Sequence, residues 1–95
     1  MADSVITNSI WIFHGENGRF SSGVFTTFEL ADDWIKNYKL TGVLTEYPLN
    51  IGVYDWAIRE DLFAAKDESQ QSPQFIQRFT SASQQHFHYE QGKIE

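Results

Sequence analysis

The sequence predicts a small α+β domain: an antiparallel sheet of about four strands with two or three helices packed mainly on one face. Three observations support this prediction. Segments rich in β-branched and aromatic residues, typical of strands, lie towards both ends of the chain. A segment between them repeats its apolar residues at helical spacing. The chain has 95 residues, the size of one domain, and its 16% aromatic content suits a small core.

The first two strands are expected to form a hairpin. Residues 9–14 (SIWIFH) predict a strand that places Ile10 and Ile12 on one face and two aromatic side chains on the other. Because both faces are apolar, we expect this strand in the interior of the sheet or under a covering segment. An Asn-Gly pair then predicts a tight turn, and residues 24–26 return as the second strand.

A helix follows the hairpin. Thr26 and Glu29 match a capping box, with Thr26 as the N-cap. Acidic residues in the first turns and lysines near the end complement the helix dipole. The apolar residues at i, i+3, i+4 and i+7, which predict the buried face, are Ala31, Trp34, Ile35 and Tyr38.

The second half of the chain alternates strand-like and helical segments. Residues 43–47 predict a strand that Pro48 ends, because proline cannot donate to a ladder. Residues 53–63 fit both a helical face and strand alternation, and their length favours a helix. Ser72 followed by proline predicts the start of a short helix. Residues 85–90 predict the last strand.

The whole chain, residues 1–95, reads as a single domain, with residues 1–8 and 92–95 expected to be loose ends. It has no cysteine, no apolar run of the roughly 20 residues that a membrane span needs, and no basic-then-apolar leader. We therefore expect a cytoplasmic protein without membrane contact. The formal net charge of −6 argues against binding nucleic acid, whose phosphates would be repelled.

Histidines give the main candidate for metal chemistry. His86 and His88 share one face of the predicted last strand, and His14 or Glu90 could supply a third ligand. Two ligands on a short strand are weak evidence, and histidines that bind no metal are more common. We therefore expect neither a metal nor a cofactor.

A nucleophilic triad could be assembled from His14, Ser21 or Ser22, and Asp55, but such triads are defined by geometry. No nucleophile-elbow pattern (G-x-S-x-G) accompanies them. The sequence thus favours a protein that is not an enzyme.

The acidic residues are the remaining candidates for function. If these carboxylates gather on one side of the protein, they could pair with Lys and Arg side chains of a partner. The simpler interpretation is that they form a solvated surface that aids solubility. The candidate partner-binding residues are Glu29, Asp32, Asp33, Asp55, Glu60, Asp61, Asp67 and Glu68.

Three segments of the chain resemble a family of small bacterial proteins: WIFHGENGRFSSGVF, TEYPLNIGVYDWAI and SPQFIQRFTSASQQHFHYE. At least one lineage of that family resembles immunity proteins of contact-dependent growth inhibition systems. The similarity runs from Ile10 to Glu90 and lies chiefly in aromatic, Gly and Pro residues.

This resemblance implies a cytoplasmic immunity protein that neutralises the toxic domain of a delivered effector, most plausibly a ribonuclease. The acidic charge fits this expectation, because a cleft that binds RNA is cationic. The resemblance assigns no catalytic residue and no individual contact. The alternative is a small-ligand or accessory domain of housekeeping type, with Tyr54, Trp56 and His86 lining a pocket.

Overall fold

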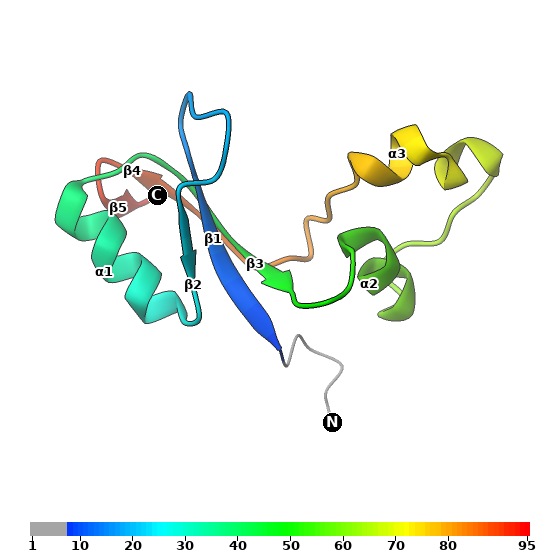
Figure 1. Ribbon diagram of the computed structural model, residues 1–95, viewed down its shortest axis with the longest axis horizontal. Helices are drawn as coiled ribbons and strands as arrows, with labels where there is room; N and C mark the ends of the chain where they lie inside the picture. The colour runs from blue at the N-terminus through cyan, green and yellow to red at the C-terminus, as the bar shows by residue number, and fades with distance from the viewer. Residues whose placement is uncertain (1–7) are drawn as a thin grey trace.

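The computed structural model describes residues 8–95 and confirms the α+β class. Its elements run in chain order as β1 (Ser9–Gly15), β2 (Gly23–Phe25), α1 (Phe28–Tyr38), β3 (Gly42–Pro48), α2 (Val53–Arg59), the 3-10 helix η1 (Glu68–Gln71), α3 (Pro73–Gln77), β4 (His86–Glu90) and β5 (Lys93–Ile94). The strands form one antiparallel sheet in the order β2-β1-β3-β4-β5. The sheet therefore has one strand more than expected (Figure 1).

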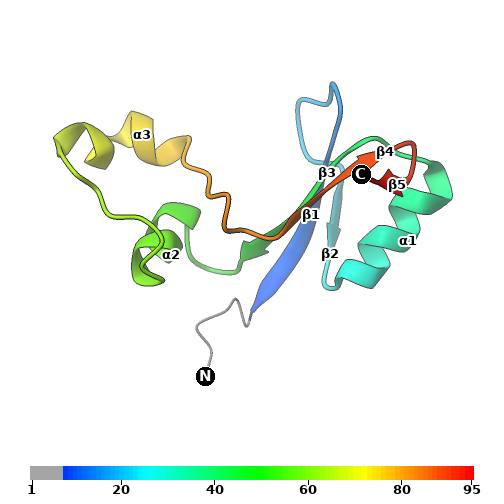
Figure 2. The same ribbon diagram turned by 180° about the vertical axis from the view of Figure 1, so that it is seen from behind.

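Strand β1 lies between β2 and β3, which confirms its predicted interior position. Its alternation sends Trp11 and Phe13 to the face that α1 covers. Ile10 and Ile12 point to the opposite face, over which no helix of residues 8–95 lies (Figures 1 and 2). Both faces of β1 are thus apolar, as predicted, but a helix of residues 8–95 covers only one of them.

The main core lies between α1 and the sheet. Aromatic rings meet edge to face within it: the ring centroids of Phe13 and Trp34 are 5.9 Å apart, and those of Trp11 and Phe28 are 5.5 Å apart. Such contacts add to the large apolar area that aromatic residues bury. The buried members of this core are Trp11, Phe13, Ala31, Ile35, Leu44 and Tyr89.

Helix α1 begins one residue later than the capping box predicted. Thr27, not Thr26, is the N-cap, and its hydroxyl accepts a hydrogen bond from the Leu30 amide at 3.2 Å. Thr26 directly follows β2, so the helix starts at the next residue with a suitable hydroxyl. Ala31 and Ile35 are buried as predicted, whereas Tyr38 at the end of the helix is mostly exposed.

Elements α2, η1 and α3 form a helical lobe (residues 53–79) that lies beyond the end of β3 (Figures 1 and 2). The ambiguous segment is helical from Val53 to Arg59, as its length suggested. Ser72 caps α3 as predicted: its hydroxyl accepts from the Phe75 amide, and proline is the first helical residue. Of the three α-helices within residues 8–95, only α1 lies on the face of the sheet (Figure 1).

The end of the described chain differs from its prediction. Residues 92–95 were expected to fray, but Lys93 and Ile94 form β5 and pair with β4. Gln91 and Gly92 make the turn at positive φ, and the Gly92 amide donates to the Leu40 carbonyl at 2.8 Å. A two-residue strand has too little sequence pattern to predict. The other expected loose end, residues 1–8, falls outside the described residues except for Asn8.

Candidate partner-binding surfaces

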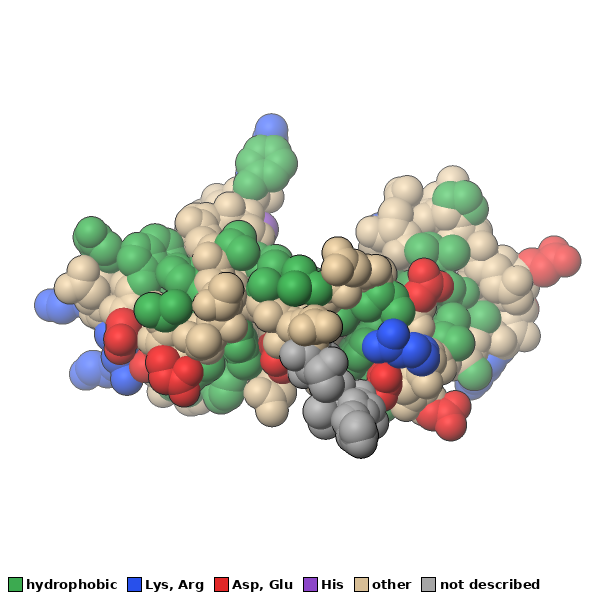
Figure 3. Space-filling view, turned by 60° about the horizontal axis from the view of Figure 1, so that its bottom comes forward, with side chains coloured by type: hydrophobic (Ala, Val, Ile, Leu, Met, Phe, Trp, Pro, Cys, Tyr) green, Lys and Arg blue, Asp and Glu red, His purple; other side chains and the backbone are tan. Residues whose placement is uncertain are grey.

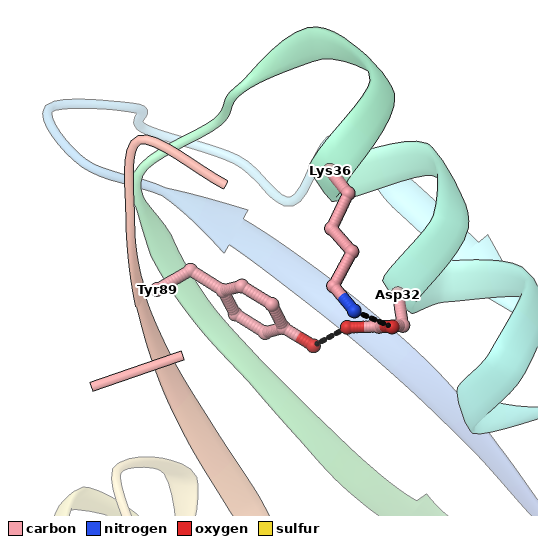
Figure 4. Close-up of polar contacts among 3 residues, drawn as sticks. All are labelled: Asp32, Lys36 and Tyr89. Carbon is pink, nitrogen blue, oxygen red and sulfur yellow. Dashed lines mark hydrogen bonds and ion pairs between the residues drawn. The ribbon is translucent and has the colours of Figure 1, made fainter. Parts of the chain in front are cut away.

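Asp32, one of the predicted partner-binding residues, is engaged inside the protein. It is only 9% exposed, and the Tyr89 hydroxyl donates to its carboxylate at 2.7 Å. The Lys36 ammonium lies 2.9 Å from the other carboxylate oxygen (Figure 4). Its prediction as a surface contact is therefore wrong: Asp32 fastens α1 to β4.

The pKa values of this cluster reflect that contact. Burial opposes the charged form of Asp32, but hydrogen bonds from Tyr89 and Lys36 and the charge of Lys36 hold its pKa below the ordinary value. Burial, together with the hydrogen bond to Asp32 and its charge, raises the pKa of Tyr89. The carboxylate is thus ionised and the phenol neutral at physiological pH.

A signal in the sequence could have placed Asp32 inside. Phe28, Ala31, Asp32 and Ile35 fall at i, i+3, i+4 and i+7, which is itself a helical stripe. A carboxylate in such a stripe requires partners. Lys36, one turn later, supplies one of them, but the Tyr89 hydroxyl comes from 57 residues further along the chain.

The other predicted acidic residues fall into two groups rather than one patch. Glu29 and Asp33 are exposed on α1, and the remaining five belong to the helical lobe. Acidic side chains accordingly appear near both ends of the molecule in Figure 3. A partner that covers one group need not reach the other.

Within the helical lobe the carboxylates differ in their engagement. Glu60 pairs with Arg59 at 3.3 Å. Asp67 caps η1, accepting from the Ser69 hydroxyl at 2.6 Å and from the Gln70 amide, and these bonds lower its pKa. Asp55, Asp61 and Glu68 are exposed and make no ion pair with another residue of 8–95.

The three histidines gather on the uncovered face of the sheet. The strand registers align His14 with Val43 and Val43 with His88 across β1, β3 and β4. His86 lies beside His88, with ring centroids 5.6 Å apart, and its Nδ1 lies 2.8 Å from the Gln84 carbonyl oxygen. Within residues 8–95, no group of three or more His, Cys, Asp or Glu side chains is arranged to hold a metal ion.

A pocket of about 400 Å³ lies beside these histidines, at the base of the β1–β2 loop. Its lining includes His14 and His88 together with the acidic residues Glu16, Glu90 and Glu95, and no Lys or Arg. None of these three glutamates was predicted as a partner-binding residue. Glu16 lies 74 or more positions before Glu90 and Glu95 in the chain, so only the pairing of the strands shows that the three side chains line one pocket.

The other candidate sites are not assembled. His14 lies near the start of the β1–β2 loop, whereas Asp55 belongs to the helical lobe, so no triad forms with Ser21 or Ser22 (Figure 1). Tyr54 donates its hydroxyl to the Gln70 carbonyl at 2.8 Å, inside the lobe. Trp56, which is 4% exposed, is also in the lobe, and His86 is exposed on β4.

The comparisons with known proteins give a family for the chain. In residues 8–95, no helix has the length and apolar content to cross a membrane. No curated protein and no solved structure matches the chain. Residues 10–95 match the family model described as a domain of unknown function, DUF7710. This match covers most of the chain, which therefore belongs to the DUF7710 family.

Proposed function

We propose that the protein is a cytoplasmic immunity protein that binds and neutralises a basic toxin nuclease domain, most directly a ribonuclease. The resemblance of three segments to a family of small bacterial proteins, at least one lineage of which resembles immunity proteins, motivates the proposal. The observation that carries it is the net charge of −6 together with exposed carboxylates that no ion pair within residues 8–95 uses, Glu16 and Glu95 among them.

The proposed mechanism is occlusion. A ribonuclease must hold phosphate groups, so its cleft presents Lys and Arg side chains. An acidic domain seated on that cleft pairs with those cations and excludes RNA. Self-protection requires fast association, and opposite net charges raise the rate of encounter. The protein itself performs no reaction under this proposal.

The test uses the toxin domain encoded beside this gene. The two proteins are purified, and RNA cleavage is followed as the immunity protein is added. We expect a 1:1 complex by size-exclusion chromatography with light scattering, and cleavage that stops at the equivalence point. A toxin domain of similar charge from an unrelated effector is the control and should remain active. Cleavage that continues at a molar excess of the protein would refute the proposal.

A further inference from the structure

We propose that the uncovered face of the sheet is the surface that docks a basic protein partner, with one Lys or Arg side chain of that partner entering the pocket beside His88. The identity of the partner as a toxin domain rests on the proposed function. The chemistry of the surface is independent of that proposed function, because it follows from the side chains that the strands bring together.

The first argument is the apolar character of this face. Antiparallel sheets with one covered face normally carry polar side chains on the other. Here Ile10, Ile12 and Val43 lie on the uncovered face, and Val24 beside Ile12 is 63% exposed. The same face also carries Thr45 and the three histidines. Apolar side chains framed by polar ones on an uncovered face are typical of an interaction site.

The second argument is the charge of the pocket at the end of this face. Its volume of about 400 Å³ falls within the range of roughly 300–1,000 Å³ found for binding sites. Glu16, Glu90 and Glu95 line it, and its lining includes no Lys or Arg. Lys93, which pairs with Glu90 across β4 and β5, lies outside the lining. A guanidinium or ammonium group complements such a lining, and a guanidinium can bind a carboxylate through two hydrogen bonds. The pocket therefore selects a cationic side chain.

The two features are continuous. Val43 belongs both to the apolar face and to the lining of the pocket, and the register places it between His14 and His88. An apolar centre with a polar rim is the usual composition of a protein interface. The helical lobe differs, because it carries Arg59, Lys66 and Arg78 as well as carboxylates, and Arg59 pairs with Glu60.

The first experiment probes the pocket without a toxin. A tetra-arginine peptide with blocked ends is titrated into ¹⁵N-labelled protein, and amide shifts are recorded by NMR. We expect saturable shifts that are largest for Glu16, Val43 and His88. Largest shifts at Asp55 or Asp61 in the helical lobe, or no saturable shift, would overturn the proposal. Shifts of the same face that depend on protein concentration alone would indicate a contact between copies and would also overturn it.

The second experiment compares two charge reversals of equal size against the toxin domain encoded beside the gene. Glu16→Lys with Glu95→Lys alters the pocket, and Asp55→Lys with Glu68→Lys alters the lobe; all four side chains are exposed. We expect the pocket variant to bind about tenfold or more weakly, and the lobe variant to change by less than about threefold. Thermal unfolding confirms that both variants fold.

The outcomes separate this proposal from the proposed function. If the lobe variant loses binding and the pocket variant keeps it, the docking surface is wrong while the immunity function stands. If the unmodified protein does not bind the toxin domain, the proposed function fails. The peptide titration then still decides whether the pocket receives a cationic side chain.

Discussion

The two parts of the molecule bury their aromatic residues to different degrees. In the core between α1 and the sheet, Phe13 and Tyr89 are almost completely buried. In the helical lobe, Trp56 is also buried. The other four rings, those of Tyr54, Phe63, Phe75 and Phe79, contact one another with centroids 4.9–6.2 Å apart, yet each stays partly exposed. The sheet core therefore supplies most of the hydrophobic stabilisation, and the lobe relies more on local contacts.

The difference follows from how each part is held. The sheet is fixed by strand pairs that join distant segments, such as Gly42 with Tyr89. The lobe uses short elements and caps, including Asp67 at η1 and Ser72 at α3. Segments with few buried contacts open at lower free energy than a packed core. We infer that substitutions in the sheet core unfold the whole domain, whereas equivalent substitutions in the lobe act locally.

The largest expected effect is that of Leu44→Ala. Leu44 is 0% exposed, and its truncation leaves a cavity in the main core. We expect a loss of about 3 kcal/mol in the free energy of unfolding, measured by urea denaturation. The matched control is Leu62→Ala in the lobe, where the side chain is 46% exposed and the loss should stay below about 1 kcal/mol. Equal losses in the two variants would contradict the comparison.

The next effect concerns the contact between α1 and β4. Asp32→Ala leaves the Tyr89 hydroxyl buried without its acceptor, which costs about 1–3 kcal/mol. Asp33→Ala, one residue away and exposed, should change stability by no more than about 0.5 kcal/mol. Thermal and urea unfolding measure both. If Asp33→Ala destabilised the protein as much as Asp32→Ala, the burial of Asp32 would not be the cause.

The same carboxylate predicts a dependence of stability on pH. The pKa of Asp32 is lower in the folded protein than its ordinary value of 3.8, so its contribution is fully present well above pH 3.8. It is lost as the pH falls through 3.8 and then through the folded-state value. Between pH 6 and pH 3, the unmodified protein should lose more stability than Asp32→Ala. Parallel losses would contradict the lowered pKa.

The smallest effect is expected at the cap of α3. Ser72→Ala removes the acceptor for the Phe75 amide and costs about 1 kcal/mol. The loss should appear as faster hydrogen exchange of α3 amides, with α1 unchanged. Ser83→Ala, at an exposed position outside any helix or strand, is the control. Faster exchange throughout the sheet would show that the lobe and the core unfold together.

Local patterns predicted most of the elements. The stripe of Ala31 and Ile35 identified α1, and Ser72 with its following proline identified α3. The sequence did not predict that β5 pairs with β4, because two residues are too few to show the alternation of apolar and polar side chains that indicates a strand. The apolar residues of β1 correctly indicated an interior strand, but whether a helix covers Ile10 and Ile12 depends on where α2 and α3 pack, which no local pattern specifies.

The candidate surfaces were less predictable. The list of carboxylates was chosen by charge, and it included Asp32, which is buried, but not Glu16 or Glu90, which line the pocket. Glu16 lies in the β1–β2 loop and Glu90 at the end of β4, so only the pairing of β3 with both β1 and β4 brings them together. Net charge indicates the sign of a partner, whereas the position of the contact requires the fold.

The most direct measurement of the central claim is the association rate of the protein with the proposed toxin domain, recorded by stopped-flow fluorescence at several salt concentrations. An acidic protein that docks on a cationic surface is steered by charge. We therefore expect the rate constant to fall by about tenfold or more between about 20 mM and about 500 mM NaCl. An association rate that stays constant across this range would contradict the account.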